Sequence, residues 1–209
     1  MQNLKETTPY RQALRDKILE TAMNAFYLNG IRAVKMDDIA RKMGISKRTL
    51  YEIYDDKEEL LYQGVKNYDR ERQEHLKSFS THHHVIDIIM EAYRIKAEDI
   101  RKRSPQFFED VLRYPKVEEY IKIRQEEGRQ KFHAFMQRGV SEGFFRKEMN
   151  YEIIAQLFDA IGRHMTENKL IRQFSMEELF VNLFLVALRG ICTPRGIEAI
   201  DQALLKFSK

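Results

Sequence analysis

A chain of 209 residues, 43% of them hydrophobic, can bury a core without a disulfide or a structural metal. Its single cysteine, Cys192, excludes an internal disulfide framework and is typical of a reducing compartment. The longest apolar run, residues 183–188, is too short to span a bilayer, so we expect a cytoplasmic protein with no membrane partner.

The net charge of +4 is concentrated at one end of the chain. Residues 1–54 contain 10 Lys and Arg against 6 Asp and Glu, whereas residues 55–209 contain 26 of each. The excess of positive charge therefore lies in the first quarter of the chain, where it would favour binding of a polyanion. Only 9 Gly and 4 Pro interrupt the chain, which favours helices over many short strands.

The first predicted helices follow one another closely. Thr8 and Pro9 are typical of an N-cap and a first helical residue, and apolar residues then recur every three or four positions up to Gly30. Short helices are expected at about 36–43 and 46–54. Asp56 and Glu59 form a capping box for a long helix that ends near residue 80.

The second half of the sequence is also helical in its pattern. After the histidines at 82–84 we expect an amphipathic helix through residues 86–97, a short helix from Ser104-Pro105, and a long helix from Pro115 to about residue 140. Further helices are expected at 150–173, 176–190 and from Pro194 onward. The fold class is therefore all-α, with about ten helices and no convincing strand, and a boundary near residue 55 where the charge asymmetry ends.

Residues 36–53, MDDIARKMGISKRTLYEI, have the spacing of two short helices that cross at a steep angle. Ala40 is small where the second helix must approach, Gly44 can adopt positive φ at the turn, and Ser46 can cap the second helix. The apolar residues that would face each other and the first helix are Ile39, Met43, Ile45, Leu50 and Ile53.

Residues 10–61 resemble the DNA-binding region of the TetR family of transcription regulators. The most specific stretch, residues 37–61, matches the family pattern at Ile39, Ala40, Gly44, Ser46, Lys47, Thr49, Leu50, Tyr51, Lys57, Glu58, Glu59 and Leu60. Residues 142–150, EGFFRKEMN, resemble a weaker element of the same family. The resemblance implies a three-helix helix-turn-helix domain at 1–55, and a helical ligand-sensing and dimerisation domain at 56–209.

The resemblance also implies a sequence-specific regulator, most simply a ligand-responsive repressor that binds a palindromic operator as a homodimer. The second motif helix would enter the major groove, where Arg48 could donate two hydrogen bonds to guanine. Lys35 replaces the usual Ser or Thr cap of the first motif helix and could reach a phosphate, whereas Tyr51 and Tyr54 could instead only cover the core. The predicted DNA-binding residues are Lys35, Ser46, Lys47, Arg48, Thr49, Tyr51, Tyr54 and Lys57.

A two-fold operator requires a dimer, and helices 150–173 and 176–190 are its expected interface, although they could be internal core. The residues predicted for the dimer interface are Ile154, Leu157, Ile161, Leu179, Leu183 and Val186. A mainly apolar cavity for an unknown small-molecule effector is expected in the same half of the chain. Its predicted lining residues are Tyr93, Gln125, Phe132, Phe158 and Arg163.

Other classes of function fit the sequence less well. The sequence contains no nucleophile elbow, no phosphate-binding glycine loop and no HExxH motif, so we expect no catalytic residues and no cofactor. The histidines at 82–84 are expected to form a polar turn and not a metal site, because adjacent residues of a helix point in different directions. A sequence-independent architectural DNA binder would show weak discrimination among sequences, and would be more basic than +4.

Overall fold

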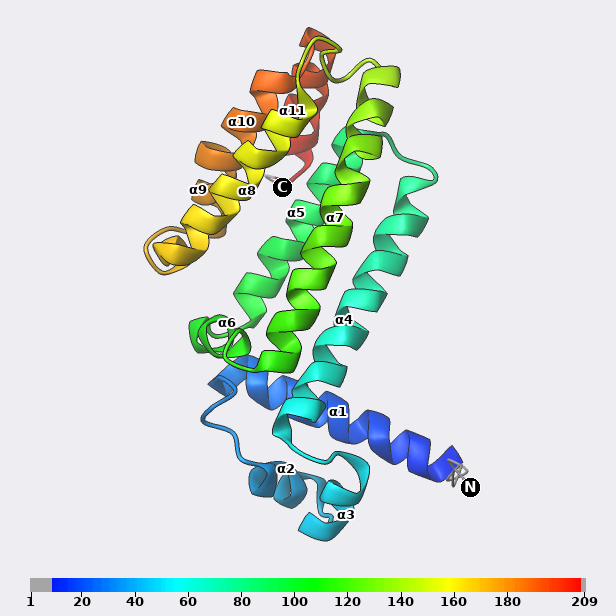
Figure 1. Ribbon diagram of the computed structural model, residues 1–209, viewed down its shortest axis with the longest axis vertical. Coiled ribbons are helices and arrows are strands. Elements are labelled where there is room, and N and C mark those ends of the chain that lie inside the picture. Colours follow the sequence, from blue (N-terminus) through cyan, green and yellow to red (C-terminus); the bar gives the residue numbers. More distant parts are fainter. Residues whose placement is uncertain (1–8, 208–209) are drawn as a thin grey trace. The chain divides into compact units, whose positions relative to one another are not determined.

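The computed structural model describes the backbone of residues 9–207 and the side chains as far as Leu205, and its described part is helical almost throughout (Figure 1). The α-helices are α1 (Pro9–Asn29), α2 (Met36–Met43), α3 (Lys47–Ile53), α4 (Lys57–Ser80), α5 (Val85–Lys102), α6 (Pro105–Val111), α7 (Pro115–Ser141), α8 (Tyr151–Glu167), α9 (Met176–Leu179), α10 (Leu185–Ile191) and α11 (Pro194–Phe207). A π-helical segment, η2 (Phe180–Phe184), joins α9 to α10, and a short 3-10 turn, η1 (Leu170–Arg172), follows α8.

The predicted all-α class is confirmed. The described chain contains about ten helical segments when α9, η2 and α10 are counted as one continuous segment. The predicted N-cap Thr8 lies outside the described residues. One expectation was wrong: α8 ends at Glu167 and does not continue to residue 173. The reason is Lys169, whose φ of 50° is left-handed and incompatible with a continuing helix. No described helix is long and apolar enough to cross a membrane.

The chain packs as two compact units. The first contains the residues up to Glu71 together with Lys102–Ile121, and the second contains Arg72–Arg101 and the residues from Lys122 onward. Helices α4 and α7 each contribute residues to both units. The functional division into 1–55 and 56–209 remains a prediction, since packing units and functional domains need not coincide.

The first unit is built on one continuous apolar core. Phe26 of α1, Ile39 of α2, Leu50 of α3 and Leu60 of α4 are each at most 1% exposed and belong to the same cluster. Ile39 and Leu50 lie at positions where the sequence pattern predicts contacts between the short helices. Burying several large side chains at this junction stabilises the crossing of α2 and α3 that positions the second of them.

The second unit has its own apolar core, and residues 142–150 organise part of it. Phe144 and Phe145 are 4% and 2% exposed, and Phe145 forms an isolated β-bridge with Cys192. Arg146 donates its backbone N–H to the Ile191 carbonyl over 3.0 Å and its Nε to the Cys192 carbonyl over 2.8 Å. This segment therefore ties the end of α7 to the junction of α10 and α11.

The turn between α2 and α3 depends on Gly44, whose φ is 66°. We expect Gly44→Ala to lower the free energy of unfolding by about 1 kcal/mol, because a side chain makes left-handed backbone unfavourable. No atom lies within 4 Å of an added Cβ, so backbone strain is the whole effect. Gly128→Ala, which also meets no atom, replaces a glycine inside α7 and should stabilise by about 0.5–1 kcal/mol. Denaturant unfolding of both variants checks these opposite signs.

Candidate nucleic-acid interface

Helix α3 begins at a well-formed cap. The Ser46 hydroxyl accepts the backbone N–H of Thr49 over 3.0 Å, and the two hydroxyl oxygens lie 2.8 Å apart. Before the cap, Ile45 donates its N–H to the Ala40 carbonyl over 3.1 Å and so closes the left-handed turn at Gly44. The start of α3 is thereby held at a fixed direction from α2, which a helix that inserts into a groove requires.

The two faces of α3 differ sharply in exposure. Leu50 is fully buried, whereas Lys47, Arg48 and Tyr51 are exposed, and Thr49 is half-buried. The helix therefore rests on one apolar residue and presents two cations and a phenol on its other side. Four of the predicted DNA-binding residues, Lys47, Arg48, Thr49 and Tyr51, thus lie on the first turns of one short helix.

Both cations of α3 have acidic partners within the motif. Arg48 donates from its Nε to Glu52 Oε1 over 2.9 Å, and this hydrogen bond and charge raise the pKa of the Arg48 guanidinium. Lys47 forms an ion pair with Asp37, at the start of α2. Sequence analysis did not single out Asp37 or Glu52. The spacing of four residues from Arg48 to Glu52 was a readable signal for one pair.

Lys35 has no side-chain hydrogen bond in the capping position of α2. The Asp38 side chain makes half of a capping box instead, because its Oδ2 accepts the backbone N–H of Lys35 over 3.1 Å. The Lys35 side chain is exposed and stands at the start of α2. It is therefore available to an anion without loss of the helix start.

Tyr54 and Lys57 are placed inside the protein to a greater extent than the sequence suggests. Tyr54 is 1% exposed, donates its hydroxyl to the Arg15 carbonyl over 3.3 Å, and has its pKa raised to about 12, chiefly by burial. The Lys57 ammonium donates to the carbonyls of Ile31 and Val34, each over 3.0 Å, and burial lowers its pKa. These contacts favour structural roles for both residues.

Helix α6 also holds the turn between α1 and α2, residues 30–34. Asp110 is 8% exposed, and its Oδ2 accepts the backbone N–H of Arg32 over 2.9 Å. The Gly30 Cα approaches α6 so closely that an added Cβ would lie 2.8 Å from Gln106 Cβ. At the other end of α6, Ser104 donates its N–H to the Tyr27 carbonyl over 2.7 Å. Together these contacts fix where α2 begins.

The residues predicted for a dimer interface fall into three groups. Val186 and Leu157 are 63% and 45% exposed, Ile161 and Leu183 are half-buried, and Ile154 and Leu179 are 8% and 4% exposed within the subunit. Ile153, one turn before Leu157 on α8, is 62% exposed. Helix α8 and the α9–α10 segment are neighbours in the fold (Figure 1).

Three of the five residues predicted to line an effector cavity belong to one aromatic group. Tyr93 stacks on Phe180 with ring centroids 3.6 Å apart, and Phe158 lies 6.4 Å from Phe132 and 5.0 Å from Phe184. Phe180 and Phe184 complete the group with a centroid distance of 5.4 Å. Gln125 and Arg163 are exposed, and neither takes part in these ring contacts. Phe180 and Phe184 were not singled out by the sequence analysis.

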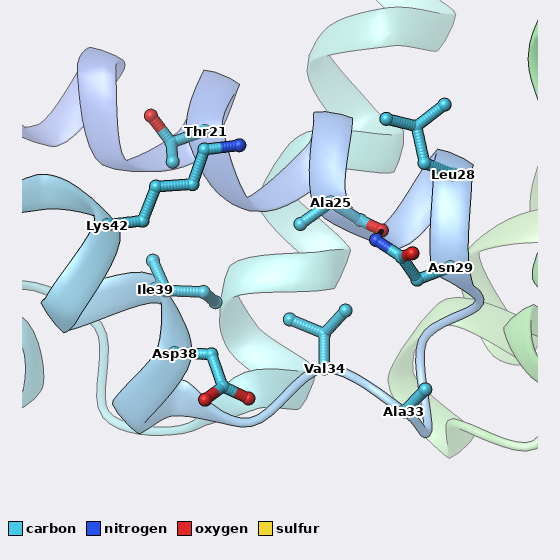
Figure 2. Close-up of a pocket in the computed structure, with 9 residues that line it drawn as sticks. All are labelled: Thr21, Ala25, Leu28, Asn29, Ala33, Val34, Asp38, Ile39 and Lys42. Carbon is cyan, nitrogen blue, oxygen red and sulfur yellow. Dashed lines mark hydrogen bonds between the residues drawn. The ribbon is translucent and has the colours of Figure 1, made fainter.

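A cavity of about 370 Å³ occurs elsewhere, in the first unit (Figure 2). It lies between α1 and α2 and contains none of the residues predicted to hold an effector. Its side chains are mainly apolar or small, with Asp38 and Lys42 at its edge, and the exposed Leu28 on its rim. This cavity adjoins the core that supports α2, so we assign it no ligand.

The histidines at 82–84 form part of the turn between α4 and α5. His83 stacks on Phe79 with a centroid distance of 3.7 Å, and the Arg138 guanidinium donates to the His83 carbonyl over 2.6 Å. Within the described chain, no three His, Cys, Asp or Glu side chains gather as a group that could hold a metal ion.

Comparison with known proteins agrees with this architecture. Residues 18–63 match the family model described as bacterial regulatory proteins, tetR family. The HTH-type transcriptional regulator YfiR of Bacillus subtilis is 21% identical over 174 residues, which cover 79% of this chain and 84% of that protein. The negative regulator IcaR of the biofilm operon icaADBC in Staphylococcus epidermidis is 37% identical over 54 residues, 26% of this chain and 29% of that protein.

A crystal structure of a transcriptional regulator from Saccharomonospora viridis in complex with choline superposes with a TM-score of 0.66 at 18% identity, covering 87% of this chain and 99% of that one. The fold and the motif together define a helix-turn-helix DNA-binding transcriptional regulator. The helix-turn-helix region, residues 18–63, therefore belongs to the TetR family of bacterial regulatory proteins.

Proposed function

We propose that the protein is a homodimeric repressor that recognises a palindromic operator through α3 and releases it when a small molecule binds in the C-terminal half. The observation that supports recognition by α3 is its amphipathic placement, with Leu50 buried and Lys47, Arg48 and Tyr51 exposed on a capped helix. A rigid short helix with exposed donors near its N-terminus is the geometry with which helix-turn-helix proteins contact base edges.

The proposed division of work follows the exposure of each side chain. Arg48 hydrogen-bonds to a guanine, Thr49 contacts a base or a phosphate, and Lys47, Tyr51 and Lys35 contact phosphates, which fix the register of the helix on the duplex. Tyr54 and Lys57 instead support the motif from inside, as their internal hydrogen bonds indicate.

Dimerisation is proposed through α8 and the α9–α10 segment. Both expose large apolar side chains, namely Ile153 and Leu157 on the first and Val186 on the second. Large apolar side chains exposed on neighbouring helices are typical of an interface. Two copies related by a two-fold axis would present two α3 helices to half-sites about 34–36 Å apart.

Control by an effector is proposed to involve the aromatic group of Tyr93, Phe132, Phe158, Phe180 and Phe184. Stacked rings of this kind favour flat or cationic organic molecules. A ligand that prefers a state with altered α3 spacing must weaken DNA binding by the same coupling free energy. Choline, present in the related Saccharomonospora viridis structure, is a suitable first probe for a titration that follows DNA release. We propose the cytoplasm as the place of action.

The proposal is tested by selecting bound duplexes from a random-sequence pool with the purified protein. We expect a two-fold symmetric sequence to be enriched. An architectural DNA binder would instead enrich no sequence. Recruitment of purified RNA polymerase in transcription from the selected site, in place of its exclusion, would identify an activator and contradict the repressor.

On the selected sequence, we expect Arg48→Ala to weaken binding about ten-fold to a hundred-fold and to relax the preference at one base pair of each half-site. Lys17→Ala removes the same charge from an exposed position of α1 and should change binding little. Fluorescence anisotropy on selected and random duplexes measures both. An equal loss on both duplexes with Arg48→Ala would remove the base-contacting role of Arg48.

A further inference from the structure

The DNA-binding motif contains acidic residues as well as basic ones. Residues 35–54 contain five Lys or Arg and three Asp or Glu. Each of the acids has a basic partner within the motif, in the pairs Asp37 with Lys47, Asp38 with Arg41, and Glu52 with Arg48. Asp38 also has a structural task, since it accepts the Lys35 N–H, but Asp37 and Glu52 hold the two cations of α3 itself.

These two pairs are too exposed to be explained by stability. The side chains of Arg48 and Glu52 are 88% and 54% exposed, and those of Lys47 and Asp37 are 66% and 39% exposed. Ion pairs in water contribute little to folding, because solvent screens the attraction and the long side chains lose freedom. We therefore look for their effect in the binding of DNA by α3.

We propose that Asp37 and Glu52 limit the electrostatic attraction of α3 to DNA and so keep binding to random sequences weak. This proposal rests on the proposed role of α3 in DNA recognition. Binding to random DNA depends almost entirely on attraction between cations and phosphates. In that complex Lys47 and Arg48 exchange a carboxylate for a phosphate, and the two carboxylates remain beside the negatively charged backbone.

The operator sequence offers base contacts that random DNA does not offer. There Arg48 leaves Glu52 for two directed hydrogen bonds to a guanine edge, which a mismatched base pair does not offer. The repulsion from the carboxylates weakens both complexes by a similar factor, but only the specific complex has base contacts that offset it. The two acids thus make binding to random DNA weak, while operator binding remains strong.

The experiment compares the charge-removing variants Glu52→Gln and Asp37→Asn with the wild-type dimer on a short random-sequence duplex and on the selected operator. Each should tighten binding to the random duplex about three-fold at low salt, and the double variant about ten-fold, because one repulsive charge is removed per substitution. The slope of log K against log salt should steepen by up to about 1 per substitution. Operator affinity should rise by a similar factor, because the same repulsive charge is removed from that complex.

Two controls isolate the effect. Glu20→Gln removes an equal charge from an exposed position on α1 and should leave random binding within about two-fold of wild type. In an Arg48→Gln background, Glu52→Gln should still tighten random binding, because the carboxylate repels the phosphates whether or not it is paired. Thermal unfolding establishes that every variant is folded.

If Glu52→Gln and Asp37→Asn bind random DNA no more tightly than Glu20→Gln, the proposal is wrong even where α3 is confirmed as the recognition helix. If the pool selection enriches no sequence, the proposed function fails. In that case tighter random binding by the variants would still report the masking of charge. The two failures are therefore distinguishable.

Discussion

Replacing Val186 by Glu should convert the protein into a monomer and weaken operator binding by at least about a hundred-fold, since the second half-site then no longer binds intramolecularly. Val186 is 63% exposed on α10, so a carboxylate there can reach water in the isolated subunit. In the proposed dimer it would be buried without a partner, which is costly. Sedimentation velocity at micromolar concentration measures the change of mass, and anisotropy measures the loss of binding.

The matched control is Ile123→Glu. Ile123 is 52% exposed on α7, outside the helices proposed for the interface. The Ile123→Glu protein should remain dimeric and bind the operator as the wild-type protein does. A Val186→Glu protein that stays dimeric, or an Ile123→Glu protein that becomes monomeric, would place the interface elsewhere.

Asp110→Ala should lower the free energy of unfolding by about 2–4 kcal/mol, because it removes a hydrogen bond to an ionised acceptor and leaves the Arg32 N–H without its partner. It also removes the negative charge that favours the protonated form of the nearby Lys57 ammonium. Since both side chains hold the turn at residues 30–34, we expect the start of α2 to loosen and operator binding to weaken more than stability alone requires. Urea unfolding and backbone hydrogen exchange of residues 30–39 measure these effects.

Two further variants separate the hydrogen bond from the charge. Asp110→Asn keeps an acceptor oxygen and should lose less stability than Asp110→Ala. Glu119→Ala changes an exposed carboxylate and should stay within about 0.5 kcal/mol of wild type. If Asp110→Ala is as stable as Glu119→Ala, the carboxylate does not hold the turn.

The parts of this protein that could be predicted from sequence are those determined by local spacing. The αL turn at Gly44, the cap at Ser46 and the burial of Leu50 follow from residues within a few positions of one another. Asp110 could not be predicted in the same way, because its partner Arg32 lies 78 positions away and depends on how α6 folds back on the turn.

The tyrosines show the same difference. Tyr51 and Tyr54 are three residues apart and look alike in sequence, yet one is 46% exposed and the other is 1% exposed. The difference arises where α3 ends: Tyr54 is the C-cap, with extended backbone, and its ring turns into the core beneath α1. Local pattern predicts that a residue is near the motif, whereas the end of the helix decides which way the residue faces.

The π-helical segment Phe180–Phe184 bears on how the proposed interface can evolve. A π turn accommodates one residue more than an α turn does. Loss of a single residue there would restore a regular α-helix and leave the residues after it on nearly the same faces, because the wider turn holds just that extra residue. Val186 would therefore stay on the surface. The same deletion inside α10 would instead rotate the residues after it by about 100° around the axis. The helix can thus lose one residue at Phe180–Phe184 without losing the proposed interface.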